Sequence, residues 1–225
     1  VFMHPLTQLI PVVADKSAPG YRVRNALAYI GIFIISAGDT VRYAIGFPAW
    51  GTISVALSIV ALVFFLRSKP IPTLRRMPRT LVALLALMLL STAWSFYPAY
   101  TLLGYAGTII ATIFALFLIA TFSWRDLLNR FANVFRVILA SSIVFELYAA
   151  LIVHGPIAPI FKNYKGEVPP SGAYYWTQGW LLKGARIQGI VGNANLLAYI
   201  AMLGFLLFAV QYAIKQPSRK LSMAS

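Results

Sequence analysis

Three long stretches of this chain contain no charged residue: 43–66, 80–124 and 187–214. A helix that crosses the hydrocarbon core of a bilayer needs about 20 mostly apolar residues. The whole chain is 60% hydrophobic and only 11% charged, with a mean hydropathy of +0.78, whereas soluble proteins carry about 25% charged residues. These features exclude an ordinary soluble fold and predict an all-α, polytopic membrane protein.

Turn-forming and interfacial residues divide the uncharged stretches into single crossings. The stretch 80–124 is too long for one span, and the sequence WSFYP at 94–98 supplies interfacial aromatics and a helix breaker at its centre. Gly46-Phe47-Pro48 separates the first two spans in the same way. The sequence predicts six spans, at 25–45, 49–66, 79–96, 100–123, 132–153 and 191–214.

The basic residues predict the orientation of these spans. The chain has 19 Lys and Arg against five Asp and Glu, a net charge of +14. Six spans place both termini on one side, and 14 of the basic residues fall on that side, which the positive-inside rule makes cytoplasmic. We therefore expect a cytoplasmic arm at 1–24, a cytoplasmic tail at 215–225 and an external loop at 154–190. The other five basic residues lie outside: Arg42, Lys162, Lys165, Lys183 and Arg186.

The basic runs are better explained by topology and contacts with anionic lipids than by a nucleic-acid site. The chain has no cysteine, which excludes disulfides and thiolate metal sites. His4 and His154 are far apart and on opposite predicted faces, so the sequence predicts no metal site and no cofactor.

Aromatic residues gather in the second half of the external loop, at Tyr174, Tyr175, Trp176 and Trp180. Trp and Tyr are enriched at the headgroup level of membranes, so an interfacial anchor is the favoured interpretation. Such rings can also stack on sugars, which makes Trp176 and Trp180 candidate substrate-binding residues.

Arg186 precedes the sequence IQGIVGNAN at the start of the last span. Its guanidinium offers paired donors suited to phosphate and stays charged, and an anion there would meet the positive end of a helix dipole. An isolated arginine beside a membrane is also commonly a topology signal or headgroup anchor. Composition alone leaves these two interpretations equally open.

Three further residues or pairs carry charge or a titratable group in or beside the predicted spans. Asp39 and Arg42 are three residues apart on one helix face, which favours a structural ion pair. Glu146 lies ten residues past Arg136, about 15 Å deeper along a helix. It could handle protons or cations, or it could be protonated and hydrogen-bonded to a neighbouring helix. His154 could act as a general base, but an ordinary interfacial residue is favoured because no orienting carboxylate is visible.

Two motifs resemble the O-antigen ligase and polymerase family of bacterial envelope enzymes. Leu90-Ser91-Thr92-Ala93-Trp94-Ser95-Phe96-Tyr97-Pro98 resembles the family's S-x-x-W-S-x-x-P element. Arg186-Ile187-Gln188-Gly189, followed by Gly192-Asn193-Ala194-Asn195-Leu196-Leu197-Ala198, resembles its R-x-x-G…G-N-x-N-x-L-A element. The resemblance extends over about residues 25–214, and its second motif is the more specific.

This resemblance implies a GT-C-like membrane glycosyltransferase that moves a glycan from an undecaprenyl-pyrophosphate carrier to an acceptor hydroxyl at the outer face of the bacterial cytoplasmic membrane. Its partners would be the lipid-linked donor, a glycan or lipid acceptor and membrane lipids, with no nucleic acid and no metal. Arg186 would bind the donor pyrophosphate, while Gly189, Gly192, Asn193 and Asn195 would shape the start of the last helix.

Family members carry a second arginine and a histidine downstream of this motif, so the chain is expected to be the N-terminal portion of a longer enzyme, inactive alone. Two alternatives stay open. One is a transporter or channel subunit in which Glu146, Asp39 and Arg42 line a polar path. The other is a catalytically silent fragment.

Overall fold

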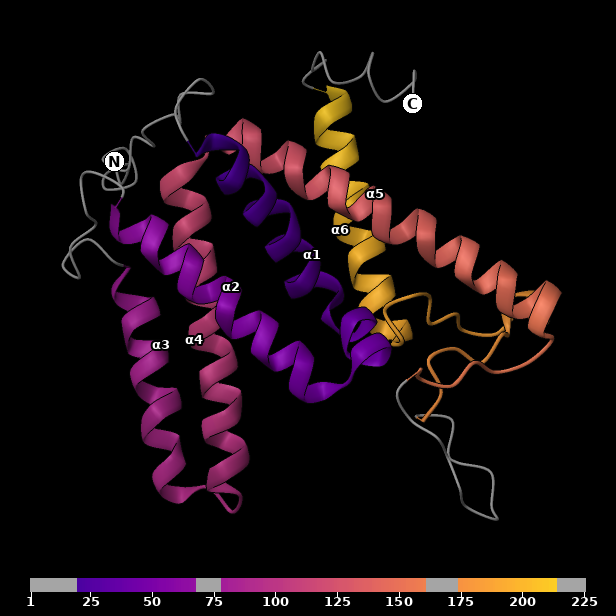
Figure 1. The fold of residues 1–225 in the computed structure, drawn as a ribbon, viewed down its shortest axis with the longest axis horizontal. Helices are drawn as coiled ribbons and strands as arrows, with labels where there is room; N and C mark the ends of the chain where they lie inside the picture. Colours follow the sequence, from indigo (N-terminus) through magenta and orange to yellow (C-terminus); the bar gives the residue numbers. More distant parts are fainter. Residues whose placement is uncertain (1–19, 68–77, 161–173, 214–225) are drawn as a thin grey trace, which may run out of the picture. The chain divides into compact units, whose positions relative to one another are not determined.

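The computed structural model describes residues 20–67, 78–160 and 174–213, and this part of the chain is helical (Figure 1). Within it the only strand-like pairing is an isolated antiparallel bridge between Ile157 and Thr177. The α-helices are α1 (Tyr21–Ile45), α2 (Phe47–Arg67), α3 (Arg79–Leu90), α4 (Pro98–Thr121), α5 (Trp124–Tyr148) and α6 (Ala194–Ala213). His4, Lys162, Lys165 and most of the predicted arm and tail lie outside the described residues.

Five helices in the described part of the chain are long and apolar enough to cross a membrane, which is consistent with a multi-pass membrane protein. The predicted third span is not among these five. There α3 has 12 residues and continues for four more as the 3-10 helix η3 (Ser91–Trp94). At roughly 1.5 and 2.0 Å of rise per residue this element is about 26 Å long, short of a core about 30 Å thick. Pro78 before it and the turn at Ser95 after it limit its length.

The fifth helix is longer than the span predicted within it. α5 begins at Trp124, eight residues before the predicted span at 132–153, and continues through a π-helical turn, Ala149–Val153. Asp126 lies in the first turn, where a carboxylate favours a helix N-terminus. The buried Arg130 donates to the Asp126 carbonyl at 2.9 Å, so charged residues that hydropathy assigns to a loop are part of the helix.

The turns between helices are where the sequence predicts them. Gly46 separates α1 from α2 with a φ of 89°. The hairpin of α3 and α4 turns between Trp94 and Pro98. There Ser95 Oγ accepts the Tyr97 amide at 3.1 Å and lies 2.6 Å from Thr101 Oγ1, which fixes the start of α4.

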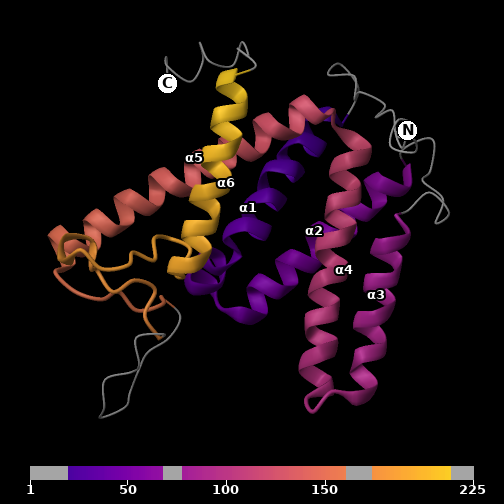
Figure 2. The ribbon, with the colours of Figure 1, turned by 180° about the vertical axis from the view of Figure 1, so that it is seen from behind.

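The chain divides into two compact units. The first comprises residues 1–27 and 54–124, with α3 and α4 side by side in both ribbon views (Figures 1 and 2). Its core is a cluster of phenylalanines. The ring centroid of Phe117 is 6.2 Å from that of Phe64 on α2, 5.5 Å from Phe114 and 6.2 Å from Phe122.

The second unit comprises residues 28–53 and 125–225, which include most of α1, all of α6 and almost all of α5. Its core contains fully buried Ile32, Ile138 and Ile200, one from each of these helices. The segment that connects α5 to α6 packs against them through Val191, which is also fully buried. The residues singled out by sequence as chemically active all belong to this unit.

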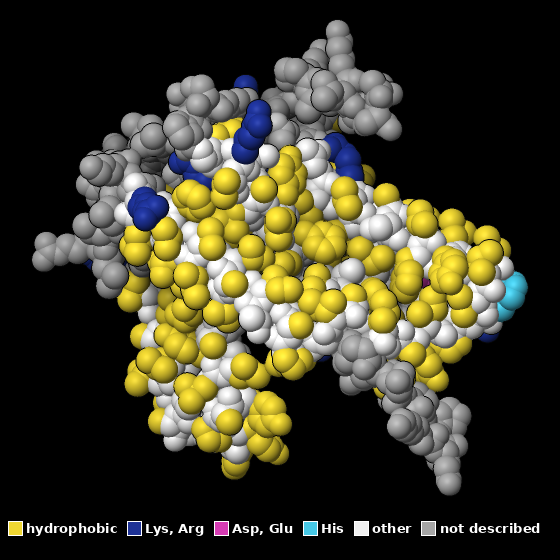
Figure 3. Space-filling model, viewed as in Figure 1, with side chains coloured by type: hydrophobic (Ala, Val, Ile, Leu, Met, Phe, Trp, Pro, Cys, Tyr) yellow, Lys and Arg dark blue, Asp and Glu magenta, His cyan; other side chains and the backbone are white. Residues whose placement is uncertain are grey.

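Hydrophobic side chains cover most of the visible surface of each unit (Figure 3). Leu87, Leu90 and Phe205, for example, are each more than half exposed. Such a surface suits a lipid environment, where apolar side chains need no protein partner.

Candidate functional site

The segment before α6 turns through two glycines that no other residue could replace without strain. Gly189 has a φ of 58°, and a Cβ there would lie 2.6 Å from Ser142 Cβ. Gly192 has a φ of 70°, and a Cβ there would collide with the ring of Tyr43. Both a left-handed backbone and a close approach therefore require glycine at these positions.

Asn193 caps α6. Its Oδ1 accepts hydrogen bonds from the amides of Asn195 at 2.9 Å and Leu196 at 3.2 Å. These are two of the amides that a helix N-terminus leaves without intrahelical partners. The positive end of the α6 dipole therefore faces the adjoining space. Asn193 accepts hydrogen bonds from two of the backbone amides at that end.

A pocket of about 290 Å³ opens beside this cap. It combines one aspartate and two arginines with polar and small groups from α1 and from the segment before α6. Its lining residues are Asp39, Arg42, Tyr43, Arg186, Gln188, Gly192, Asn193, Ala194 and Asn195. Two arginines against one aspartate leave one net positive charge among these side chains.

Arg42 is held in the pocket by residues of its own helix. Its Nε lies 3.1 Å from Asp39 Oδ1, which confirms the predicted ion pair. The contact is an ion pair without the alignment of a hydrogen bond, because Arg42 Nε has no hydrogen-bond partner among the described residues. Its guanidinium also lies 5.1 Å from the centroid of the Tyr43 ring, within cation–π range.

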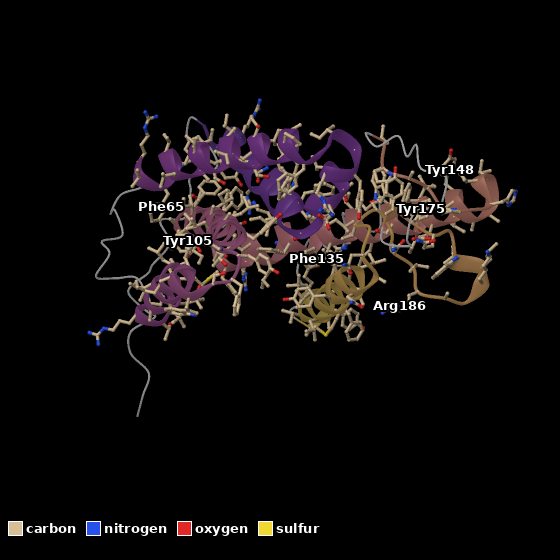
Figure 4. The ribbon with its side chains drawn as sticks, turned by 90° about the horizontal axis from the view of Figure 1, so that it is seen from below. Phe65, Tyr105, Phe135, Tyr148, Tyr175 and Arg186 are labelled. Carbon is tan, nitrogen blue, oxygen red and sulfur yellow. The ribbon has the colours of Figure 1, made fainter. Side chains whose placement is uncertain are left out.

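Arg186 lies on the segment that leads into α6 and is exposed (Figure 4). Its Nη1 donates to Asn195 Oδ1 at 3.3 Å, near the long limit for such a bond. The side chain also lines the pocket. The structure brings Arg186 together with Gly192, Asn193 and Asn195, as the motif predicts.

The two candidate tryptophans differ in exposure. Trp176 is only 8% exposed, and its ring lies against Tyr43 and Phe145, with centroids 5.7 and 5.1 Å away. Its Nε1 donates to the Ile190 carbonyl at 2.6 Å. This packing gives Trp176 a structural role, whereas Trp180 is 41% exposed and keeps a face for a ligand or a headgroup. Sugar stacking stays a prediction.

Glu146 has partners that the sequence did not reveal. The side chain is fully buried, and its Oε1 accepts hydrogen bonds from Thr177 Oγ1 and from the amides of Gln188 and Gly189. A hydrogen bond to a neighbouring helix was one of the two interpretations left open by the sequence, whereas these donors belong to the connecting segment. Gly189 thus bonds to Glu146 instead of lining the pocket.

His154 ends the π-helical turn in a left-handed conformation with a φ of 56°. Its Nδ1 lies 3.1 Å from the carbonyl oxygen of Ala150, one turn earlier. This exposed side chain caps the end of its own helix and does not line the pocket.

Several pocket residues were not singled out as binding residues by the sequence, among them Arg42 and Gln188. Arg42 was assigned only to an ion pair, and Gln188 was only part of a motif. An arginine at the end of a predicted span, on the same predicted side as Arg186, is the signal that could have linked the two. Among the described residues, no group of three His, Asp or Glu side chains could hold a metal ion.

A scan against family models, a search of curated proteins and a search of solved structures each find no match to this chain. The resemblance stated above therefore rests on the motifs alone.

Proposed function

We propose that the pocket binds the pyrophosphate of a polyprenyl-linked glycan, and that the chain serves a GT-C-like enzyme that transfers this glycan to an acceptor hydroxyl. The observation that carries this proposal is that Arg42 and Arg186, from α1 and from the segment before α6, line one pocket beside the helix dipole of α6. The resemblance of the motif around Arg186 supplies the substrate class.

The chemistry of glycan transfer needs such a site. The acceptor oxygen forms a bond to the anomeric carbon while the bond from that carbon to the pyrophosphate oxygen breaks, and the hydroxyl proton passes to water or to the departing pyrophosphate. Negative charge then grows on the leaving pyrophosphate. Fixed cations in a partly dry site stabilise that charge without reorganising. Arg186 contributes paired donors, and Arg42 contributes a second positive charge that the motif itself does not contain.

The position of the pocket suits a lipid-linked donor. It lies at the ends of two apolar helices, α1 and α6, so a lipid can stay in the bilayer while its headgroup reaches the arginines. The charge distribution of the sequence supports placing this end outside and both termini in the cytoplasm of a bacterial cell. Membrane lipids and a glycan or lipid acceptor complete the proposed partners.

A transport path through Glu146, Asp39 and Arg42 has less support. Asp39 and Arg42 line the pocket, while Glu146 is fully buried and hydrogen-bonded to backbone amides.

Transfer by the protein from the complete reading frame, reconstituted in liposomes with polyprenyl-pyrophosphate-linked oligosaccharides, tests the proposal. Release of polyprenyl pyrophosphate is the measurement. Arg186→Ala should lower the rate of transfer by about 100-fold or more. This is the loss expected when one hydrogen-bond donor to a developing oxyanion is removed. Arg186→Lys should also be impaired because lysine lacks the paired donors.

Lys183→Ala, which removes a nearby exposed cation outside the pocket, is the matched control. Normal transfer by both Arg186 variants would refute the assignment.

A further inference from the structure

One carboxylate oxygen holds the connecting segment at two points. Glu146 Oε1 accepts the Gln188 amide at 2.9 Å and the Gly189 amide at 2.7 Å. It also accepts the hydroxyl of Thr177 at 2.8 Å. Thr177 is itself paired with Ile157 through the isolated bridge. Glu146 therefore joins α5 to the connecting segment at two places, at Thr177 and at Gln188-Gly189.

Ile190, the next residue, is also held by hydrogen bonds at its amide and at its carbonyl. The Ile190 amide donates to Ser142 Oγ at 3.2 Å, one turn before Glu146 on α5. The Ile190 carbonyl accepts from Thr40 Oγ1 at 2.9 Å and from Trp176 Nε1 at 2.6 Å. The amides of three successive residues are thus bonded to side chains of α5, and the last carbonyl is bonded to α1 and the connecting segment.

Such anchoring has a physical cause. Non-helical backbone close to a membrane core is tolerated only where its polar groups find partners in the protein. A glutamate side chain is well suited to the task because one of its oxygens can accept several hydrogen bonds. Removing it would leave two buried backbone amides without acceptors, which is costly.

The anchored turn sets the geometry of the pocket. Arg186 lies two residues before Gln188, and Gly192 lies two residues after Ile190. Glu146 does not line the pocket itself. Its effect on the pocket must therefore pass through the backbone that it holds.

We propose that Glu146 is a positioning residue: its carboxylate fixes the 188–190 turn and thereby places Arg186 to bind the pyrophosphate group. The ligand in this statement rests on the proposed function, while the positioning of the turn does not.

Two substitutions at one position separate hydrogen-bond acceptance from the ability to ionise. Glu146→Gln keeps a carbonyl oxygen that can accept the same three bonds but cannot ionise. Glu146→Leu removes the acceptor and keeps a side chain of similar size. Ile138→Ala is the matched control, because it removes a fully buried side chain two turns earlier on α5 without touching the turn.

Hydrogen–deuterium exchange of peptides covering 186–193 is the first measurement, on the purified chain in nanodiscs. Loss of the acceptor should speed exchange there on the order of tenfold in Glu146→Leu. Glu146→Gln and Ile138→Ala should stay near wild type in this segment. Unchanged exchange in Glu146→Leu, or equal acceleration in Ile138→Ala, would overturn the proposal.

Calorimetric titration with inorganic pyrophosphate is the second measurement. Glu146→Leu should bind about tenfold more weakly than wild type, and Glu146→Gln within about threefold of it. A Glu146→Gln protein as impaired as Glu146→Leu would overturn positioning in favour of a role for the charge. If wild type itself does not bind pyrophosphate, the proposed function fails. The exchange result then decides whether Glu146 holds the turn.

Discussion

Arg136 and Arg186 contact opposite ends of α6 and differ in how their guanidinium groups are held. Arg136, on α5, donates to Asn133 Oδ1 at 2.8 Å and to Gln211 Oε1 at 2.6 Å, near the end of α6. It also lies 4.8 Å from the centroid of the Phe208 ring. Arg186 makes one long bond, to Asn195 near the start of α6, and lines a pocket.

The difference shows what separates a structural arginine from one available to a ligand. At Arg136 the donors are used by Asn133 on the same helix and by Gln211 on α6. Gln211 in turn donates to Asn129 on α5 at 2.8 Å. Three helices are joined in this way, because Asn133 also donates to the Tyr29 hydroxyl on α1 at 3.3 Å. Residue type does not distinguish the two arginines, but their partners do.

The largest effect on stability is expected at Arg136. Arg136→Ala leaves the Gln211 and Asn133 oxygens without their charged donor and should lower the free energy of unfolding by about 2 to 3 kcal/mol. Arg186→Ala, which loses one exposed bond, should change it by less than about 0.5 kcal/mol. Unfolding in detergent measures both. Equal destabilisation would remove the distinction between the two arginines.

A smaller effect is expected from the glycine in the pocket wall. Gly192→Ala should cost about 1 to 2 kcal/mol for the left-handed backbone, with a smaller further cost for displacing the Tyr43 ring. Gly184→Ala is the control, since Gly184 has a φ of 67° but no atom within 4 Å of the position that a Cβ would take. The difference between the two variants, measured by unfolding, isolates the packing against Tyr43. Equal losses of stability in the two variants would show that the Tyr43 ring moves aside at this end of α6 without a cost in free energy.

The smallest effect is expected at the cap of α6. Asn193→Ala removes the acceptor for two amides and should destabilise the protein by about 1 kcal/mol. Asn193→Ser should recover most of this loss, since serine caps nearly as well. Thermal unfolding provides the comparison, and an alanine variant as stable as wild type would show that the cap is not needed at this end of α6.

Much of the helical framework follows from the sequence. Uncharged stretches mark the helices, and Gly46 and the 94–98 turn divide them, because these signals are local. The spacing of Asp39 and Arg42 on one helix predicted their ion pair for the same reason. The short third helix and the start of α5 before its predicted span did not follow from the sequence, because hydropathy measures apolar length and does not show where a helix begins or ends.

The candidate site was only partly predictable. The motif placed Arg186 near Asn193 and Asn195, since all three are close in sequence. The meeting of Arg42 with Arg186, and of Glu146 with the Gln188 amide, depends on contacts between distant segments. The burial of Trp176 was hidden as well, because an irregular segment has no periodicity to show which side chains point inward.

Titration of the purified chain with inorganic pyrophosphate tests the central claim most directly, with Arg186→Ala and Arg136→Ala compared with wild type. Wild type and Arg136→Ala should bind with affinities within about twofold, because Arg136 lies outside the pocket. Arg186→Ala should bind about 10- to 100-fold more weakly, the loss expected for charge-assisted hydrogen bonds. Equal affinity of wild type and Arg186→Ala would contradict the account.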